Sequence, residues 1–349
     1  MLREACLYQK LKKPKGAVRC LTCNHYCLIS PGKRGAPPRR GICGTRENRN
    51  AKIYSLVYGQ AVAENVDPIE KKPLFHFMPG TFSLSIATVG CPFQCKWCQN
   101  WQISQAPKPD KQIEGFELSP QKIVQDAIAE KCQSISYTYT EPAIFLEYAL
   151  DTMKLAKKEG LKNIWVSDGY SSKEALTLVA PYLDAINVDL KAFKDETYRK
   201  YCGGRLQPVL ESLKTIKKLG IHLEVTTLII PAINDSKKEL TQIAQFIKKY
   251  LGENTPWHIS RFFPAYQLLN LPPTPVETLE KAYQIGKKAG LKFVYLGNVF
   301  NTEKESTFCP KCGQEIIHRE NYNIKIQNLK IKSQKGFCKN CGEDLNIRL

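Results

Sequence analysis

The fold is decided by residues 82–100, which read FSLSIATVGCPFQCKWCQN. Residues 82–88 predict a β-strand, and the turn after it carries Cys91, Cys95 and Cys98. Thiolates are soft ligands that suit iron-sulfur clusters or zinc. Three protein ligands on a four-iron cube leave one iron open to a small molecule. The structural alternatives are a zinc site or three buried cysteines.

Working outward from this strand, β-rich runs alternate with helical patterns. Ser119 and Pro120 predict a helix start, and Gly160, Gly220 and Gly290 each follow a helical pattern that ends before the next strand. Repeated strand-helix units predict a parallel sheet whose functional residues follow the carboxyl ends of the strands. We therefore predict an α/β fold, a partial (β/α)6 TIM-type barrel. The expected strands are 82–88, 134–139, 163–167, 185–190, 221–230, 258–263 and 292–296.

Composition narrows the functional classes. The chain has 349 residues, a formal net charge of +18 and 14 cysteines, most of them in clusters with metal-ligand spacing. A membrane helix needs roughly 18 consecutive apolar residues, and we find no such run and no signal peptide. We expect a cytoplasmic protein with reduced thiols. The basic charge is compatible with a nucleic-acid partner, an acidic partner or a lysine-rich surface.

Cysteine clusters flank the predicted barrel. Cys20, Cys23, Cys27 and Cys43 are expected to bind zinc or an auxiliary iron-sulfur centre, with zinc slightly favoured, and residues 31–41 between them read as a flexible loop. Two CxxC knuckles predict a zinc ribbon whose folding depends on the bound metal. The expected domains are a cysteine-rich metal-binding module at 1–50, the barrel at 51–304 and the ribbon-like module at 305–349. The ribbon ligands are Cys309, Cys312, Cys338 and Cys341.

The CxxxCxxC spacing, with aromatic Trp97 before the last cysteine, resembles the radical S-adenosylmethionine (SAM) superfamily. The resemblance implies that Cys91, Cys95 and Cys98 hold a [4Fe-4S] cluster whose free iron binds SAM. It also implies an enzyme that cleaves SAM reductively to a 5′-deoxyadenosyl radical, which abstracts hydrogen from a substrate. A flavodoxin or ferredoxin is the implied reductant.

The same resemblance suggests further cofactor contacts after the second and third strands. Glu141 matches the acid of a Gly-Gly-Glu motif that binds the SAM amino group, although Tyr139 and Thr140 replace the glycines. Ser167 and Asp168 match the middle of an Asp-Thr-Asn-Gly segment that contacts SAM in activating enzymes. The alternative for Glu141 is an ordinary acid at a helix N-terminus.

Later strands add four candidate residues. Asp189 and Lys191 share one face of a strand because they are two residues apart, and the resemblance places them at the SAM pocket. A salt bridge at the barrel rim is their structural alternative. His258 and Arg261 match a histidine-bearing strand that approaches SAM, although core histidines and surface arginines are common.

Residues 67–80, 90–105, 139–142 and 295–299 resemble AmmeMemoRadiSam-system enzymes, relatives of pyruvate formate-lyase activating enzymes. Residues 31–40 form a longer loop than that family has. The resemblance makes AMMECR- or Memo-type proteins candidate partners. Three functions stay open: radical generation on a protein, radical modification of an RNA base or small metabolite, and non-enzymatic nucleic-acid binding by a metal-stabilised scaffold.

Overall fold

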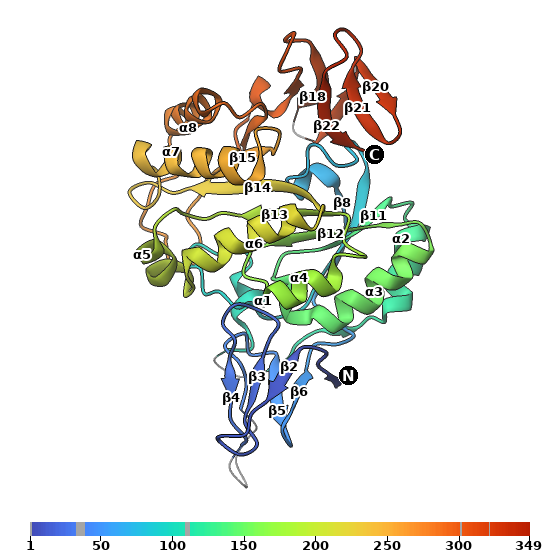
Figure 1. Cartoon of the computed structure of the whole chain (residues 1–349), viewed down its shortest axis with the longest axis vertical. Helices are drawn as coiled ribbons and strands as arrows, with labels where there is room; N and C mark the ends of the chain where they lie inside the picture. Colours follow the sequence, from blue (N-terminus) through green and yellow to red (C-terminus); the bar gives the residue numbers. More distant parts are fainter. Residues whose placement is uncertain (1, 33–38, 109–111, 301, 321) are drawn as a thin grey trace.

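The centre of the protein is an eight-stranded sheet (Figure 1). The computed structural model describes residues 2–32, 39–108, 112–300, 302–320 and 322–349, so residues 33–38 of the predicted flexible loop lie outside the described residues. In the described ranges the sheet order is β16-β15-β14-β13-β12-β11-β9-β8. The strands are β8 (Ala63–Pro68), β9 (Phe82–Ala87), β11 (Ser134–Tyr137), β12 (Lys162–Ser167), β13 (Ala185–Asp189), β14 (His222–Ile229), β15 (Trp257–Arg261) and β16 (Val294–Gly297).

The strands from β9 to β16 are mutually parallel, which confirms the α/β class and its parallel sheet. Strand β8 is antiparallel to β9 and was not predicted. Its sequence, AENVDP, mixes polar and apolar residues and is mostly exposed or half-buried, so it lacks the apolar run typical of a buried strand. Because the strands from β9 to β16 run parallel, all of their carboxyl ends lie at the same edge of the sheet.

Helices connect successive parallel strands. The Ser119 hydroxyl accepts a hydrogen bond from the Lys122 amide at 3.1 Å, with Pro120 at the first helical position, as the sequence predicts. Gly160 and Gly290 follow their helices with φ of +78° and +90°, values that favour glycine. The principal helices are α1 (Trp101–Gln105), α2 (Pro120–Ala129), α3 (Leu146–Lys158), α4 (Lys173–Val179), α5 (Asp195–Thr197), α6 (Leu206–Lys218), α7 (Lys237–Phe246) and α8 (Val276–Ala289).

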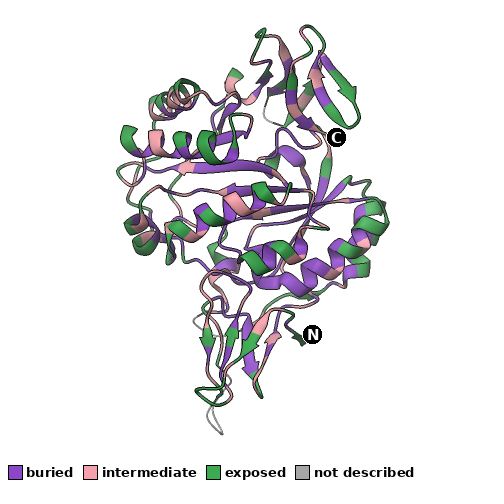
Figure 2. Cartoon of the chain, viewed as in Figure 1, coloured by how far each residue is buried: buried purple, intermediate pink, exposed green. Residues whose placement is uncertain are grey.

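The core lies between the sheet and these helices (Figure 2). Trp165 on β12 and Trp257 on β15 are fully buried, and the inward faces of the helices pack around such side chains. Within the described residues, no helix has both the length and the apolar character needed to cross a membrane.

The N-terminal strands form two small sheets at one end of the molecule (Figure 1). A separate cluster that includes Ala5, Val18, Ile29 and Ile53 fills the space between them. The strands are β1 (Arg3–Glu4), β5 (Arg46–Arg49) and β6 (Lys52–Ser55) in one sheet, and β2 (Tyr8–Lys10), β3 (Val18–Cys20) and β4 (Leu28–Ile29) in the other.

A buried ion pair ties these strands to the helices around the central sheet. Arg46 on β5 donates to both carboxylate oxygens of Glu147 on α3, at 2.8 and 3.1 Å, and both side chains are almost fully buried. Bidentate geometry of this kind offsets part of the desolvation cost of two buried charges. The pair therefore fixes the N-terminal sheets against α3.

Replacing only one partner should be costly, because the other charge stays buried and unpaired. We expect Arg46→Met to lower the free energy of unfolding by about 3–5 kcal/mol, and Arg46→Met/Glu147→Met to recover most of that loss. Urea denaturation measures both. The exposed pair Lys122 and Asp126 is the control, since Lys122→Met should change stability by less than about 1 kcal/mol. A double variant as unstable as Arg46→Met would contradict this expectation.

The C-terminal strands form two three-stranded sheets at the other end of the molecule (Figure 1). The Arg319 guanidinium donates to the Phe75 carbonyl at 2.8 Å, and the Leu345 carbonyl lies 2.8 Å from Nδ1 of His76. The module is thus packed on the segment between β8 and β9. Its strands are β17 (Thr307–Phe308), β18 (Glu315–Glu320) and β19 (Asn323–Ile326), and β20 (Leu329–Lys332), β21 (Lys335–Cys338) and β22 (Asp344–Arg348).

Candidate active site

The loop after β9 carries Cys91, Cys95 and Cys98 at the carboxyl edge of the sheet. The Gln94 amide donates to the Cys202 carbonyl at 2.7 Å, and the Lys96 amide donates to the Tyr201 carbonyl at 3.0 Å. The Lys108 ammonium donates to the Phe93 carbonyl at 2.6 Å. The loop therefore takes its shape from backbone bonds to the π-helix Tyr198–Cys202 and from the residues after α1.

Gly90 is required where this loop begins. Its φ is +102°, and a Cβ there would lie 2.5 Å from Cγ2 of Thr45 and 2.9 Å from the Cys43 carbonyl oxygen. Any larger residue would push the three-cysteine loop away from the N-terminal sheets. The loop and the Cys43 turn are thus in direct contact.

The three cysteines open into a cavity of ≈480 Å³. The carboxyl ends of four strands contribute to its wall, as expected for a site built on a parallel sheet. Most of the residues predicted to bind the cofactor are brought together here. They are Trp97, Tyr139, Thr140, Glu141, Ser167, Asp168, Asp189 and Lys191.

Glu141 is buried and receives hydrogen bonds from its own chain. Its carboxylate accepts from the Ser167 hydroxyl at 3.0 Å, the Asp168 amide at 2.8 Å and the Ala143 amide at 3.2 Å. Burial, followed by the nearby Asp168 charge, raises the pKa of Glu141 well above its usual value. A carboxylate offers about four acceptor positions, so these donors use most of them. Glu141 therefore lies in the cavity wall and holds the carboxyl end of β12 in place.

Asp168 is more available to a ligand. Its Oδ1 accepts from the Tyr170 amide at 2.9 Å, and its Oδ2 lies 3.6 Å from the Cys91 sulfur. Burial raises the pKa of this carboxyl group as well. Asp168 thus places an acidic side chain directly beside the first cysteine.

Tyr139 replaces a glycine of the Gly-Gly-Glu motif, yet its backbone keeps the left-handed conformation. Its φ is +62°, its carbonyl accepts from the Asn100 amide group at 2.9 Å, and its hydroxyl donates to Asp67 at 2.5 Å. The Lys72 ammonium contacts the same Asp67 oxygen at 2.5 Å. Burial lowers the pKa of Lys72 to about 8, against the opposing effect of Asp67. Side-chain bonds therefore hold the turn that glycine would adopt freely.

Asp189 and Lys191 form an ion pair at the cavity, with 2.7 Å between Oδ2 and Nζ. The Lys191 side chain is 12% exposed and the Asp189 side chain 40% exposed. Although burial opposes it, the charge of Asp189 and of nearby thiols raises the pKa of Lys191 well above its usual value. The pair places a fixed cation next to the cysteine loop.

His258 and Arg261 lie apart from this cavity. His258 contacts Glu224 at 2.7 Å through Nε2, and Glu224 also accepts from the amides of Phe75 and His76. Arg261 donates through Nε to the Thr274 carbonyl at 2.8 Å and, among the described residues, is not part of the cavity lining.

A second cavity of ≈420 Å³ adjoins the first and contains His258 in its wall. Phe263, Phe300 and Tyr322 line it and are 38%, 76% and 58% exposed. Tyr322 lines both cavities although it belongs to the C-terminal module, and the sequence carries no local signal for this. Lys71, Pro73, Gln99, Thr226, Ser260 and Asn298 also line both cavities.

The C-terminal knuckles bring four thiols together. The sulfurs of Cys309 and Cys341 are 3.5 Å apart, and those of Cys312 and Cys338 are 3.7 Å apart. All four sulfurs lie within 4.8 Å of one another, so the group could hold a metal ion. Each knuckle is followed by a glycine with positive φ, Gly313 and Gly342.

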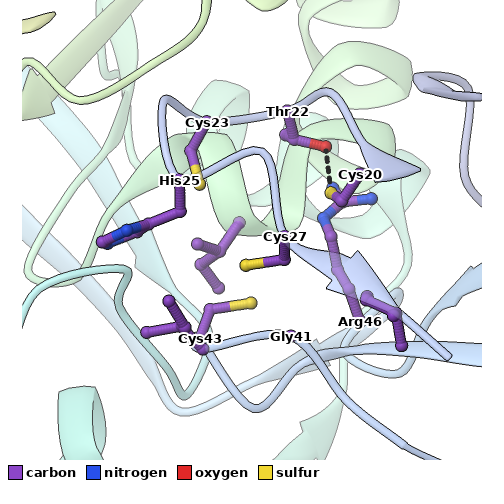
Figure 3. Close-up of a pocket in the computed structure, with 11 residues that line it drawn as sticks. Cys20, Thr22, Cys23, His25, Cys27, Gly41, Cys43 and Arg46 are labelled. Carbon is purple, nitrogen blue, oxygen red and sulfur yellow. Dashed lines mark hydrogen bonds between the residues drawn. The ribbon is translucent and has the colours of Figure 1, made fainter. Parts of the chain in front are cut away.

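The N-terminal cysteines surround a different space (Figure 3). Cys20, Cys23, Cys27 and Cys43 all line one small cavity together with Arg46. His25, between Cys23 and Cys27, points its Nε2 at the Pro92 carbonyl of the three-cysteine loop, 3.0 Å away. The structure thus places the predicted N-terminal site directly beside the candidate active site.

Comparisons with known proteins agree with this geometry. Residues 85–247 match the model of the radical SAM superfamily. The chain is 46% identical to an uncharacterised protein of Methanocaldococcus jannaschii over 348 residues, 100% of both chains. It is 22% identical over 192 residues to a pyruvate formate-lyase-activating enzyme of Clostridium pasteurianum, covering 52% of this chain and 77% of that protein.

A solved domain of a pyruvate-formate lyase-activating enzyme from Bacteroides vulgatus is 17% identical and aligns with a TM-score of 0.42, covering 47% of this chain and 99% of that domain. The family implies a [4Fe-4S] cluster and SAM as cofactors. The chain belongs to the radical SAM superfamily and is a radical SAM enzyme related to the activating enzymes of that superfamily.

Proposed function

We propose that this enzyme cleaves SAM reductively at a [4Fe-4S] cluster held by Cys91, Cys95 and Cys98, and that the resulting radical abstracts hydrogen from a protein segment. The observation that carries the proposal is the single cavity lined by three cysteines, three acids and lysines that include Lys191. The donor set fits both groups, because three soft thiolates suit iron and buried carboxylates suit the cationic end of SAM. In the proposed arrangement the sheet curves around this cavity as a partial barrel.

The chemistry of the bound cluster is the delivery of one electron to SAM, which yields methionine and a 5′-deoxyadenosyl radical. The chain's own residues bind SAM, orient it and shield it from solvent. Asp168 is placed to accept a hydrogen bond from SAM beside Cys91, while Glu141 holds Ser167 and the Asp168 backbone in position. Lys191, fixed by Asp189, is placed to contact a carboxylate.

The relatives and the adjoining cavity support a protein substrate. The chain is similar to proteins named as activating enzymes, and the second cavity is lined by exposed aromatic side chains that suit a peptide segment. Flavodoxin or ferredoxin is the proposed reductant. AMMECR- and Memo-type proteins remain the first candidates to assay as partners.

Anaerobic reconstitution with iron and sulfide tests the proposal. After addition of dithionite and SAM, 5′-deoxyadenosine should accumulate, as measured by liquid chromatography. A reconstituted protein that holds a reducible cluster yet releases no 5′-deoxyadenosine would overturn it. Addition of a true protein substrate should raise the rate of cleavage, whereas RNA should leave the rate unchanged.

The different roles proposed for the acids of the cavity give a separate prediction. Loss of a hydrogen bond to a charged group costs about 1.5–3 kcal/mol, so Asp168→Asn should weaken SAM binding about 10- to 100-fold. Asp189→Asn should weaken binding less, by under about threefold, because this carboxylate is half solvated and acts on SAM only through Lys191. Calorimetric titration with SAM measures both. The reverse ranking would assign the SAM contact to Asp189.

A further inference from the structure

The cysteine groups of this chain differ in how closely their sulfurs approach. A tetrahedral zinc site has Zn–S bonds of about 2.3 Å, which places the sulfurs roughly 3.8 Å apart. The C-terminal quartet matches this, with separations of 3.5 and 3.7 Å. Among the residues that the structure describes, it is also the one group whose ligand atoms all lie within 4.8 Å.

The N-terminal quartet has a more open arrangement. Cys20, Cys23, Cys27 and Cys43 line one cavity, yet among the described residues only the C-terminal quartet, and not these four, is gathered closely enough to stand out as a group that could hold a single metal ion. Figure 3 shows the labelled side chains arranged around an open space. Cys91, Cys95 and Cys98 share this property. A cubane places an iron atom at each thiolate, so its ligands are farther apart than those of a single zinc ion.

The surroundings of the N-terminal cavity suit an anionic cluster. Three of the four cysteines are buried, and the apolar side chains of Ile29, Ile42 and Ile144 form part of the wall. Arg46 lines the cavity at 1% exposure. Its Nε has no hydrogen-bond partner within the described part of the chain, although its two terminal nitrogens contact Glu147. A buried guanidinium with an unused donor is suited to a thiolate or sulfide acceptor.

This cavity is joined to the three-cysteine loop by direct contacts. His25 lies 3.0 Å from the carbonyl of Pro92, the residue after Cys91. The ring of Tyr170 packs against His25 and Phe93, with centroid separations of 4.8 Å in both cases. These contacts hold the two cysteine groups at a fixed separation.

We propose that Cys20, Cys23, Cys27 and Cys43 hold a second [4Fe-4S] cluster, coordinated by four thiolates, in place of the zinc that their sequence spacing slightly favours. It is reducible by one electron and is paired with the cluster at Cys91, Cys95 and Cys98 through the His25 contact. The pairing rests on the proposed function, whereas the N-terminal cluster itself does not.

Metal content of full-length variants tests the assignment. After anaerobic reconstitution the wild type should contain about eight iron atoms, and Cys95→Ala and Cys23→Ala/Cys27→Ala about four each. Cys132→Ser, a cysteine outside all three groups, should match the wild type. Wild-type protein with about four iron atoms and a second zinc that Cys23→Ala/Cys27→Ala removes would overturn the proposal.

Electron paramagnetic resonance gives a readout that does not depend on the N-terminal variants folding. Dithionite-reduced Cys95→Ala, in which the N-terminal site is intact, should show the signal of a reduced cubane; its absence would overturn the proposal. The spectrum of the reduced wild type should be broader than the sum of the spectra of the two variants. A wild-type spectrum equal to that sum would overturn the pairing. In Cys23→Ala/Cys27→Ala the three-cysteine loop is intact. If this variant contained no iron, the result would count against the proposed function instead.

Discussion

Replacement of Cys95 by alanine should lower the rate of 5′-deoxyadenosine formation by at least about 1000-fold, equivalent to roughly 4 kcal/mol in the barrier. Cys95 is the middle and most buried ligand of the loop, at 8% exposure. With two thiolates left, the site cannot hold a cubane whose fourth iron is free for SAM. Anaerobic turnover with SAM and dithionite measures the loss.

Cys202 is the matched control for this experiment. It is fully buried on the π-helix that supports the loop, and its thiol interacts with that of Cys95. Cys202→Ala should keep cleavage within about threefold, because this residue supports the loop through its backbone carbonyl. If Cys95→Ala retained activity and Cys95→Ala/Cys202→Ala lost it, Cys202 would be able to act as a ligand.

We expect the C-terminal quartet to hold a metal ion whose loss unfolds the last module. Binding of zinc to small cysteine sites provides about 10–16 kcal/mol of apparent free energy, which is also folding free energy. The module's own core is small, with Ile316, Ile317, Leu345 and Ile347 as its fully buried apolar residues. Cys312→Ser/Cys341→Ser should therefore remove about one metal ion per chain and make the region after about residue 305 sensitive to protease.

Limited proteolysis with mass spectrometry and metal analysis measures this effect. The central α/β region should remain resistant, since its core is a separate cluster. Cys132→Ser should leave both the metal content and the digestion pattern unchanged. A double variant that keeps its metal and its protease resistance would show that the knuckles fold without the ion.

Local sequence signals predicted the elements that depend on neighbouring residues. The parallel strands follow from β-rich runs separated by helical patterns that end at glycine, and the cysteine loop follows from spacing on a single turn. Contacts between distant segments were not predictable in the same way. The polar partners of Glu141 lie 26 and 27 residues away, and Tyr322 reaches the cavity only because its module packs on the Phe75 segment.

Ligand spacing in sequence also leaves the metal undetermined. CxxC-type patterns occur in both cysteine quartets, yet only the folded chain sets the distance between sulfurs that are far apart in sequence. Cys43 joins its group from beyond residues 33–38, and Gly90 fixes its turn against the catalytic loop. His258 illustrates the same limit, because its partner Glu224 comes from a neighbouring strand.

Tyr322 lies between the two C-terminal knuckles and forms part of the catalytic wall. The three-cysteine loop and the predicted cofactor-binding residues up to Lys191 precede it by more than a hundred residues. During synthesis, the three-cysteine loop therefore emerges well before the residue that completes the cavity wall. The full wall is thus present only in chains whose segment after about residue 305 has been synthesised and has packed on the Phe75 segment.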